Sequence, residues 1–293
     1  MKSRNFLLLI LFVVPLLFLF AQSEDNVEIK PVVLHGTEIH KLISSNNGVT
    51  YPIYISLPGS YNSGKKYPVV YMLDAYSSFG TMTQMAKLLA FSKEIPELII
   101  VGISSGGGSK EFIYNRARDF TPTKVSLDKL PEELHIMTPT SGGADQFMEF
   151  IEKDLIPFVE SNYNVEQNER TLVGHSYGGL FCLYTLFTKP ELFNRYVSIS
   201  PALFWDDEYL AKVEREFYTK NKNLHKTVYT AVGKLEHERF RNPFVRLINS
   251  IEERNYKGLK LITKIADDET HYSIIPYIVT HGLNKVFYNY HKE

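Results

Sequence analysis

The sequence predicts an α/β domain with a mostly parallel central sheet, an antiparallel N-terminal edge and helices on both faces. Short apolar runs recur along the chain, and several are continuous, as expected of strands that helices cover on both sides. Segments with helical spacing separate the later runs, so that strand and helix alternate. The predicted strands are Val27–His40, Val49–Leu57, Tyr67–Leu73, Leu98–Ile103, Thr171–Val173, Tyr196–Ile199, Thr227–Val232 and Leu259–Ile265.

The order of these elements defines the edge and the layers. No helical segment separates the first two strands, which therefore suggest an antiparallel hairpin at an edge of the sheet. Apolar residues three and four apart predict helices at Asp145–Tyr163, Arg239–Arg254 and Ile275–Tyr290, and another follows Gly179. Ser104–Gly143 has weak periodicity between two glycine clusters, and we expect an irregular segment that could form a mobile cap over a site.

Composition excludes several classes of protein. The chain has 293 residues, 44% of them hydrophobic and 22% charged, which excludes an intrinsically disordered protein. Lys and Arg number 32 against 33 Asp and Glu, so no net positive field favours nucleic acid as a partner. The single cysteine, Cys182, cannot form an intramolecular disulfide, and its apolar neighbours predict a buried thiol.

The N-terminus has the pattern of an export signal. Lys2 and Arg4 precede an uncharged run from Phe6 to Phe20, and Ala21-Gln22-Ser23 then meets Glu24. Pro15 interrupts this run, which is shorter than the roughly 20 residues of a membrane-spanning helix. We therefore predict a signal peptide at residues 1–23 and a single domain at residues 24–293, exported to the periplasm or secreted, without stable membrane insertion after cleavage. An uncleaved N-terminal anchor is the alternative.

The segment Gly174-His175-Ser176-Tyr177-Gly178 carries the strongest chemical signal. It follows the predicted strand that ends at Val173 and opens the helical run Leu180–Thr188. A Gly-x-Ser-x-Gly turn between strand and helix exposes the serine at a sharp bend, with the positive end of the helix dipole beside it. Ser176 is therefore the predicted nucleophile, and a tight turn in a non-catalytic protein is the alternative.

A serine nucleophile needs a base, and the base needs an orienting acid. Where such a serine turn joins a strand to a helix in an α/β sheet, the three residues follow one another along the sequence as Ser, acid and His. Glu236 follows the strand Thr227–Val232, and Glu238 is the alternative acid. His271 follows the strand Leu259–Ile265 on a loop near the C-terminus and is the candidate base. The sequence lacks the spaced histidines of a zinc helix, so we expect no metal.

Other residues are candidates for contacts with a substrate. His175 is expected to pack within the turn or to face an acyl pocket. Trp205, with Phe204, follows a strand and could form an aromatic wall, or an ordinary packed pair. Arg116 and Arg118 could meet an anionic substrate, although internal pairing with Asp119 is favoured.

Several stretches, in order along the chain, are similar to one family. They are Tyr67-Pro68-Val69-Val70-Tyr71-Met72-Leu73-Asp74, Arg116-Ala117-Arg118-Asp119-Phe120-Thr121-Pro122, Gly142-Gly143-Ala144-Asp145-Gln146-Phe147, the Ser176 turn and Ser198-Ile199-Ser200-Pro201-Ala202-Leu203-Phe204-Trp205. Together they resemble the esterase branch of the α/β-hydrolases over roughly residues 50 to 290. This branch includes siderophore trilactone esterases, S-formylglutathione hydrolase, feruloyl esterases and mycolyltransferases.

The resemblance implies roles for particular residues. Ser176 would be the nucleophile, His271 the base and Glu236 the acid, although some members work with a Ser–His pair alone. The backbone N–H groups of Tyr177 and Tyr76 would form the oxyanion hole. Ala75 stands where many relatives have glycine, which could narrow that loop. No cofactor is implied.

These features predict a serine esterase that acts on a small-molecule ester, such as a siderophore, outside the cytoplasm. The alternatives are an esterase that removes acyl groups from polysaccharides, or an acyltransferase. A non-catalytic binding protein on the same fold is an alternative of another class. The presence of candidate nucleophile, base and acid favours an enzyme.

Overall fold

The computed structural model of the protein describes residues 32–62, 64–106, 109–135, 138, 140–288 and 290. The described residues from Leu34 onward form one compact unit. The predicted signal peptide and the predicted domain start at residue 24 lie outside the described residues. No helix in the described part of the chain combines the length and the apolar character needed to cross a bilayer.

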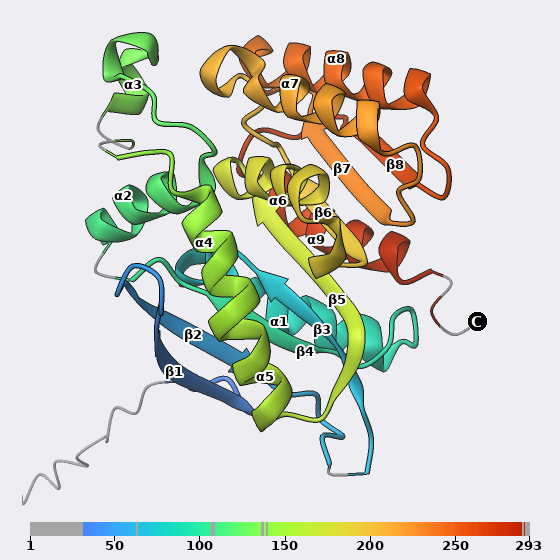
Figure 1. The fold of residues 1–293 in the computed structure, drawn as a ribbon. Helices are drawn as coiled ribbons and strands as arrows, with labels where there is room; N and C mark the ends of the chain where they lie inside the picture. The colour runs from blue at the N-terminus through green and yellow to red at the C-terminus, as the bar shows by residue number, and fades with distance from the viewer. Residues whose placement is uncertain are drawn as a thin grey trace, which may run out of the picture. The chain divides into compact units, whose positions relative to one another are not determined.

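A mixed sheet of eight strands runs through the described residues in the order β1-β2-β4-β3-β5-β6-β7-β8 (Figure 1). The strands are β1 (Thr37–Ile43), β2 (Thr50–Ser56), β3 (Tyr67–Met72), β4 (Ile99–Ile103), β5 (Val165–His175), β6 (Arg195–Ile199), β7 (Thr227–Gly233) and β8 (Lys260–Ala266). β2 pairs antiparallel with β1 and β4, and the other pairs are parallel. The predicted sheet with its antiparallel N-terminal edge is confirmed.

The helices lie on both faces of the sheet (Figure 1). They are α1 (Ala75–Phe91), α2 (Ser109–Phe120), α3 (Glu132–His135), α4 (Ala144–Phe150), α5 (Ile156–Asn162), α6 (Tyr177–Thr188), α7 (Trp205–Lys220), α8 (Glu238–Arg254) and α9 (Ile274–Val286). A π-helical turn, Ile151–Leu155, joins α4 to α5, so the predicted helix Asp145–Tyr163 is observed as one nearly continuous helical segment.

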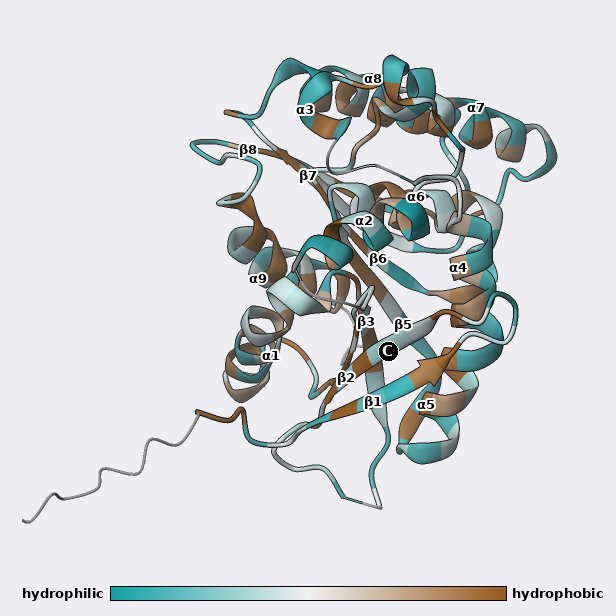
Figure 2. Cartoon of the chain, turned by 90° about the vertical axis from the view of Figure 1, so that its left-hand side faces the viewer, coloured by the Kyte–Doolittle hydropathy of each residue, from teal (hydrophilic) through white to brown (hydrophobic). Residues whose placement is uncertain are grey.

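Alternating residues of the central strands enter two separate cores. In β3, Val70 packs with α1 and α9, whereas Tyr71 packs in the larger core beneath α4, α6 and α8. This separation follows from the two-residue period of a strand. Figure 2 shows the hydrophobic colour along the central strands and the mixed character of α8, whose buried face includes Phe244 and Leu247.

The prediction of an irregular segment at Ser104–Gly143 is wrong in its first half. Ser109–Phe120 forms helix α2, and two short helical turns follow it, one of them α3. The hydrophobic period misses α2 because two of its buried residues, Arg116 and Asp119, are charged. Each is held by an ion pair, so burial of this helix does not require an apolar stripe.

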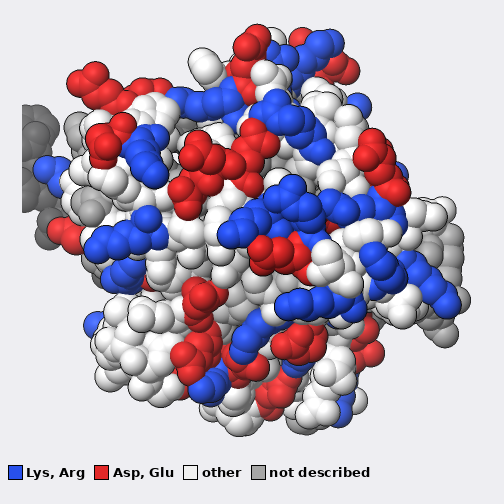
Figure 3. All heavy atoms as spheres, turned by 45° about the horizontal axis from the view of Figure 1, so that its top comes forward, with Lys and Arg blue, Asp and Glu red and all other residues white. Residues whose placement is uncertain are grey.

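Two features of composition have a structural counterpart. Cys182 is fully buried in α6, as predicted, and burial raises the pKa of its thiol well above the usual value. Figure 3 shows basic and acidic side chains interspersed on the face that it presents, in keeping with the balanced charge of the chain.

Candidate active site

The turn between β5 and α6 presents Ser176 in a strained conformation. Its φ of 59° and ψ of −117° are unusual for a residue with a side chain. The turn is tight because α6 returns against the end of β5: a Cβ at Gly174 would lie 2.3 Å from the carbonyl oxygen of Gly178. A Cβ at Gly179 would lie 2.7 Å from the carbonyl oxygen of Ile199. These two glycines are therefore required by close backbone approach.

Glu236 and His271 meet beside this turn, although each lies on a different loop after a parallel strand. The His271 Nδ1 lies 2.6 Å from the Glu236 Oε2. Glu236 is buried, and its other oxygen accepts a hydrogen bond from the backbone N–H of Gly233 at 2.7 Å and another from the hydroxyl of Ser200. A carboxylate held in this way keeps the imidazole proton on Nδ1 and leaves Nε2 as the acceptor.

The geometry separates the two candidate acids. Glu238 begins helix α8, its side chain is 74% exposed, and an arginine of the same helix lies 4.0 Å from it. Glu236, by contrast, contacts the candidate base directly. The structure thus brings Glu236 to His271 and leaves Glu238 at the surface.

His175 supports the loop that carries His271. Its Nε2 lies 2.7 Å from the carbonyl oxygen of His271, and the two ring centroids are 4.5 Å apart. Burial, followed by the nearby His271 and Arg116, lowers the pKa of His175 well below its usual value. The neutral ring can therefore donate its Nε2–H to this carbonyl. His175 also lines the cavity, as one of the sequence alternatives expected.

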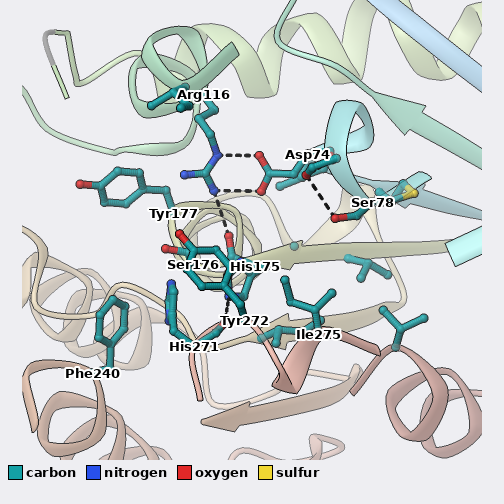
Figure 4. Close-up of a pocket in the computed structure, with 18 of the residues that line it drawn as sticks. Asp74, Ser78, Arg116, His175, Ser176, Tyr177, Phe240, His271, Tyr272 and Ile275 are labelled. Carbon is teal, nitrogen blue, oxygen red and sulfur yellow. Dashed lines mark hydrogen bonds and ion pairs between the residues drawn. The ribbon is translucent and has the colours of Figure 1, made fainter. Parts of the chain in front are cut away.

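Arg116 has a different partner from the predicted one. Its guanidinium binds both carboxylate oxygens of Asp74, at 2.6 and 2.9 Å, and donates to the carbonyl oxygen of His175 at 3.2 Å (Figure 4). Arg118 is the residue that pairs with Asp119. The sequence could not separate these partners because Asp74 lies 42 positions away from Arg116.

A cavity of about 650 Å³ opens above Ser176 and His271. Figure 4 shows Phe240, Tyr272 and Ile275 around these residues, with Arg116 and Asp74 on the opposite side. The ring of Phe240 lies 4.4 Å from that of His271. The sequence did not predict Phe240 and Tyr272 as cavity-lining residues, although Tyr272 directly follows the candidate base and Phe240 lies four positions after the candidate acid. The lining of the cavity is largely apolar, and charged side chains such as Asp74, Arg116 and Arg239 also contribute to it.

Trp205 does not line this cavity. It is buried, its indole N–H donates to the hydroxyl of Thr123 at 2.9 Å, and its ring packs edge-on against Tyr177 at 5.4 Å. Its neighbour Phe204 does reach the lining. The predicted aromatic wall thus retains Phe204, and Trp205 lies behind Tyr177 as a packing residue.

Two helix N-termini converge at the site. Tyr177 is the first residue of α6, and Tyr76 is the second residue of α1, which is separated from β3 by Leu73 and Asp74. Backbone N–H groups in the first turn of a helix have no partner within it and carry partial positive charge. Both are therefore of the type that can stabilise an oxyanion. Among the described residues, no group of three or more His, Cys, Asp or Glu is arranged to hold a metal ion.

Several known proteins are similar to this chain in sequence and in fold. The family model described as "Putative esterase" matches residues 44–272. The ferri-bacillibactin esterase BesA of Bacillus subtilis is 36% identical over 258 residues, which cover 85% of this chain and 88% of the relative. The crystal structure of a BES protein from Bacillus cereus superposes with a TM-score of 0.78 at 30% identity, over 89% of this chain and 98% of that chain.

An IroE-like serine hydrolase from Shewanella oneidensis is also similar, with a TM-score of 0.75 and 28% identity over 87% of this chain and 81% of that one. The fold and these likenesses define an α/β-hydrolase. The chain belongs to the esterase family that its family model describes, and it is an ester-hydrolysing serine hydrolase.

The low pKa of His175 makes the stability of the fold depend on pH. Unfolded histidine titrates near pH 6.5, so the unfolded chain takes up this proton first as the pH falls. The stabilisation that neutral His175 gives to the folded state is complete above about pH 6.5. It is lost as the pH falls from there toward the lower pKa of His175 in the folded protein. Between about pH 7 and pH 5.5 the wild type should lose about 1 kcal/mol more unfolding free energy than His175→Gln.

Urea denaturation at the two pH values measures this difference, with the exposed His281→Gln as the matched control. Equal losses in the wild type and His175→Gln would contradict the lowered pKa of His175 in the folded protein.

Proposed function

We propose that this esterase hydrolyses a siderophore ester or a similarly small ester, with Ser176 as nucleophile, His271 as base and Glu236 as the orienting acid. The observation that carries this proposal is the Glu236–His271 hydrogen bond beside a strained serine turn, at the base of an apolar cavity. The substrate class is supported by the relative named as a ferri-bacillibactin esterase.

The proposed reaction has two halves. His271 Nε2 removes the proton of the Ser176 hydroxyl while the Oγ attacks the ester carbonyl. The tetrahedral intermediate then collapses, His271 gives its proton to the departing alkoxide, and an acyl-serine remains. Water next loses a proton to His271 and attacks the acyl-serine. The second collapse releases the carboxylic acid, and His271 returns its proton to the Ser176 oxygen.

The oxyanion of each intermediate would accept hydrogen bonds from the backbone N–H groups of Tyr177 and Tyr76. Support comes from the position of both residues in the first turns of helices. Removal of a single donor of this kind typically lowers kcat by about 10²- to 10³-fold. The apolar walls formed by Phe204, Phe240 and Ile275 would exclude water from these bonds and strengthen them.

Hydrolysis of p-nitrophenyl esters, from acetate to octanoate, tests the nucleophile and the base. Ser176→Ala and His271→Ala should each lose at least about 10²-fold in kcat/KM, because each removes a bond-forming or proton-transferring group. Ser161→Ala, at an exposed position, is the control for expression and folding. An inert wild type, or an active Ser176→Ala, would refute the esterase mechanism and favour a binding protein.

The acid is tested by a pair of equivalent substitutions. Glu236→Gln should lower kcat by about 10²-fold or more, because the amide cannot hold the same proton arrangement on His271. Glu238→Gln removes a carboxylate of the same size at the surface and should leave kcat within about twofold. Full activity in Glu236→Gln would mean that a Ser–His pair works alone.

We also propose that residues 1–23 direct export of the chain and are then removed. Support comes from the basic start and the apolar run that precede Glu24. Expression of the full chain, followed by N-terminal sequencing of the extracytoplasmic fraction, should yield protein that begins at or near residue 24. Recovery from the membrane with Met1 intact would indicate an anchor, and recovery only from the cytosol would refute export.

A further inference from the structure

Arg116 joins the two segments that carry the candidate oxyanion donors. It enters from helix α2, which contributes neither the nucleophile nor the base. Its Nε and Nη2 hold the two carboxylate oxygens of Asp74, and Nη2 also donates to the carbonyl of His175. Asp74 immediately precedes the helix that contains Tyr76, and His175 immediately precedes Ser176. One guanidinium thus links the β3–α1 turn to the β5–α6 turn (Figure 4).

Both linked turns have backbone conformations that must be held. Asp74 has a φ of 58° and a ψ of 34°, in the left-handed region. This region is strained for a residue other than glycine. The carbonyl of Asp74 also accepts hydrogen bonds from Ser77 and Ser78, so its conformation sets where helix α1 begins. A change in the Asp74 side chain would therefore shift the position of the Tyr76 N–H group.

The surroundings of the pair restrict its movement. Arg116 is 8% exposed and Asp74 is 6% exposed. The guanidinium lies 5.5 Å from the ring centres of both Phe120 and Tyr177. Gly178 lies so close that a Cβ there would be 3.3 Å from the Asp74 Oδ2, which sets the carboxylate against the first turn of α6.

We propose that Arg116 is a positioning residue that sets the distance between the two oxyanion donors, and that it does not act by binding an anionic substrate. The inference rests on the proposed function. The carboxylate of Asp74 already neutralises the charge of Arg116, and the planar guanidinium can donate hydrogen bonds to both oxygens of this carboxylate at once. A displacement of about 1 Å at a catalytic group can lower the rate by about 10²-fold, so loss of this link should slow the chemical step.

The test replaces the pair with neutral groups of similar size, as Asp74→Asn/Arg116→Met. The double variant avoids an unpaired buried charge, which would destabilise the fold. The matched control is Arg118→Met/Asp119→Asn, because Arg118 and Asp119 form an ion pair at 2.7 Å on the same helix, away from the cavity. The measurements are kcat and KM for neutral p-nitrophenyl acetate and for a p-nitrophenyl ester whose acyl group carries a carboxylate. Inhibition by a trifluoromethyl ketone and by the corresponding methyl ketone is measured as well.

We expect the Asp74/Arg116 variant to lose about 10²-fold in kcat with KM within about threefold of the wild type. Inhibition by the trifluoromethyl ketone, which forms an oxyanion on serine, should weaken by a similar factor. Inhibition by the methyl ketone, which largely remains a ground-state ligand, should change little. The control variant should keep kcat within about threefold.

A raised KM with unchanged kcat would make Arg116 a substrate contact and overturn the proposal. Equal weakening of both ketones, or an unchanged kcat, would overturn it as well. Arg116→Lys provides a second test if the double variant does not fold, because lysine keeps the charge but lacks the fork. It should lose about tenfold in kcat at constant KM, and full activity would overturn the proposal. Failure of the proposed function is distinct: it appears as an inert wild type or an active Ser176→Ala.

Discussion

The close approach of helix α6 to the end of strand β5 is the constraint on which the site depends. The backbones of Gly174 and Gly178 are in close contact, and this approach lets the chain reverse at one strained residue, Ser176. The helix then runs through the larger core with nearly every side chain buried, including Phe181 and Cys182. Burial of a whole helix supplies the stability that holds the strained turn in place.

Parallel strands bring the remaining groups to the same edge. Asp74, Glu236 and His271 follow β3, β7 and β8, whose carboxyl ends lie on one side of the sheet. These loops are far apart in the sequence, yet the alignment of the strands places them around one cavity. The strand directions therefore determine where these loops begin. Buried polar contacts then determine the conformation of each loop.

The buried polar contacts around the site act together. Glu236 accepts three hydrogen bonds, from His271, Gly233 and Ser200, and Arg116 spans Asp74 and His175. Removing such groups from water is costly, so each contributes only while its partners are in place. Because each buried polar group needs its particular partner, one arrangement of the loops is more stable than the alternatives. Apolar contacts alone would not distinguish these arrangements. The need for polar partners also explains why helix α2 carries buried charge and has no continuous apolar stripe.

The fold class and the turn at Ser176 could be predicted from the sequence, because both depend on short-range pattern. Strand and helix periods predicted the mostly parallel sheet with its antiparallel edge, and the glycines around Ser176 predicted the strained turn. Tertiary structure alone decided which carboxylate meets His271, that Arg116 pairs with Asp74, and that Phe240 lines the cavity while Trp205 lies behind it. These partners lie tens of residues apart, and side-chain pairing across loops follows from packing in three dimensions, which no local period records.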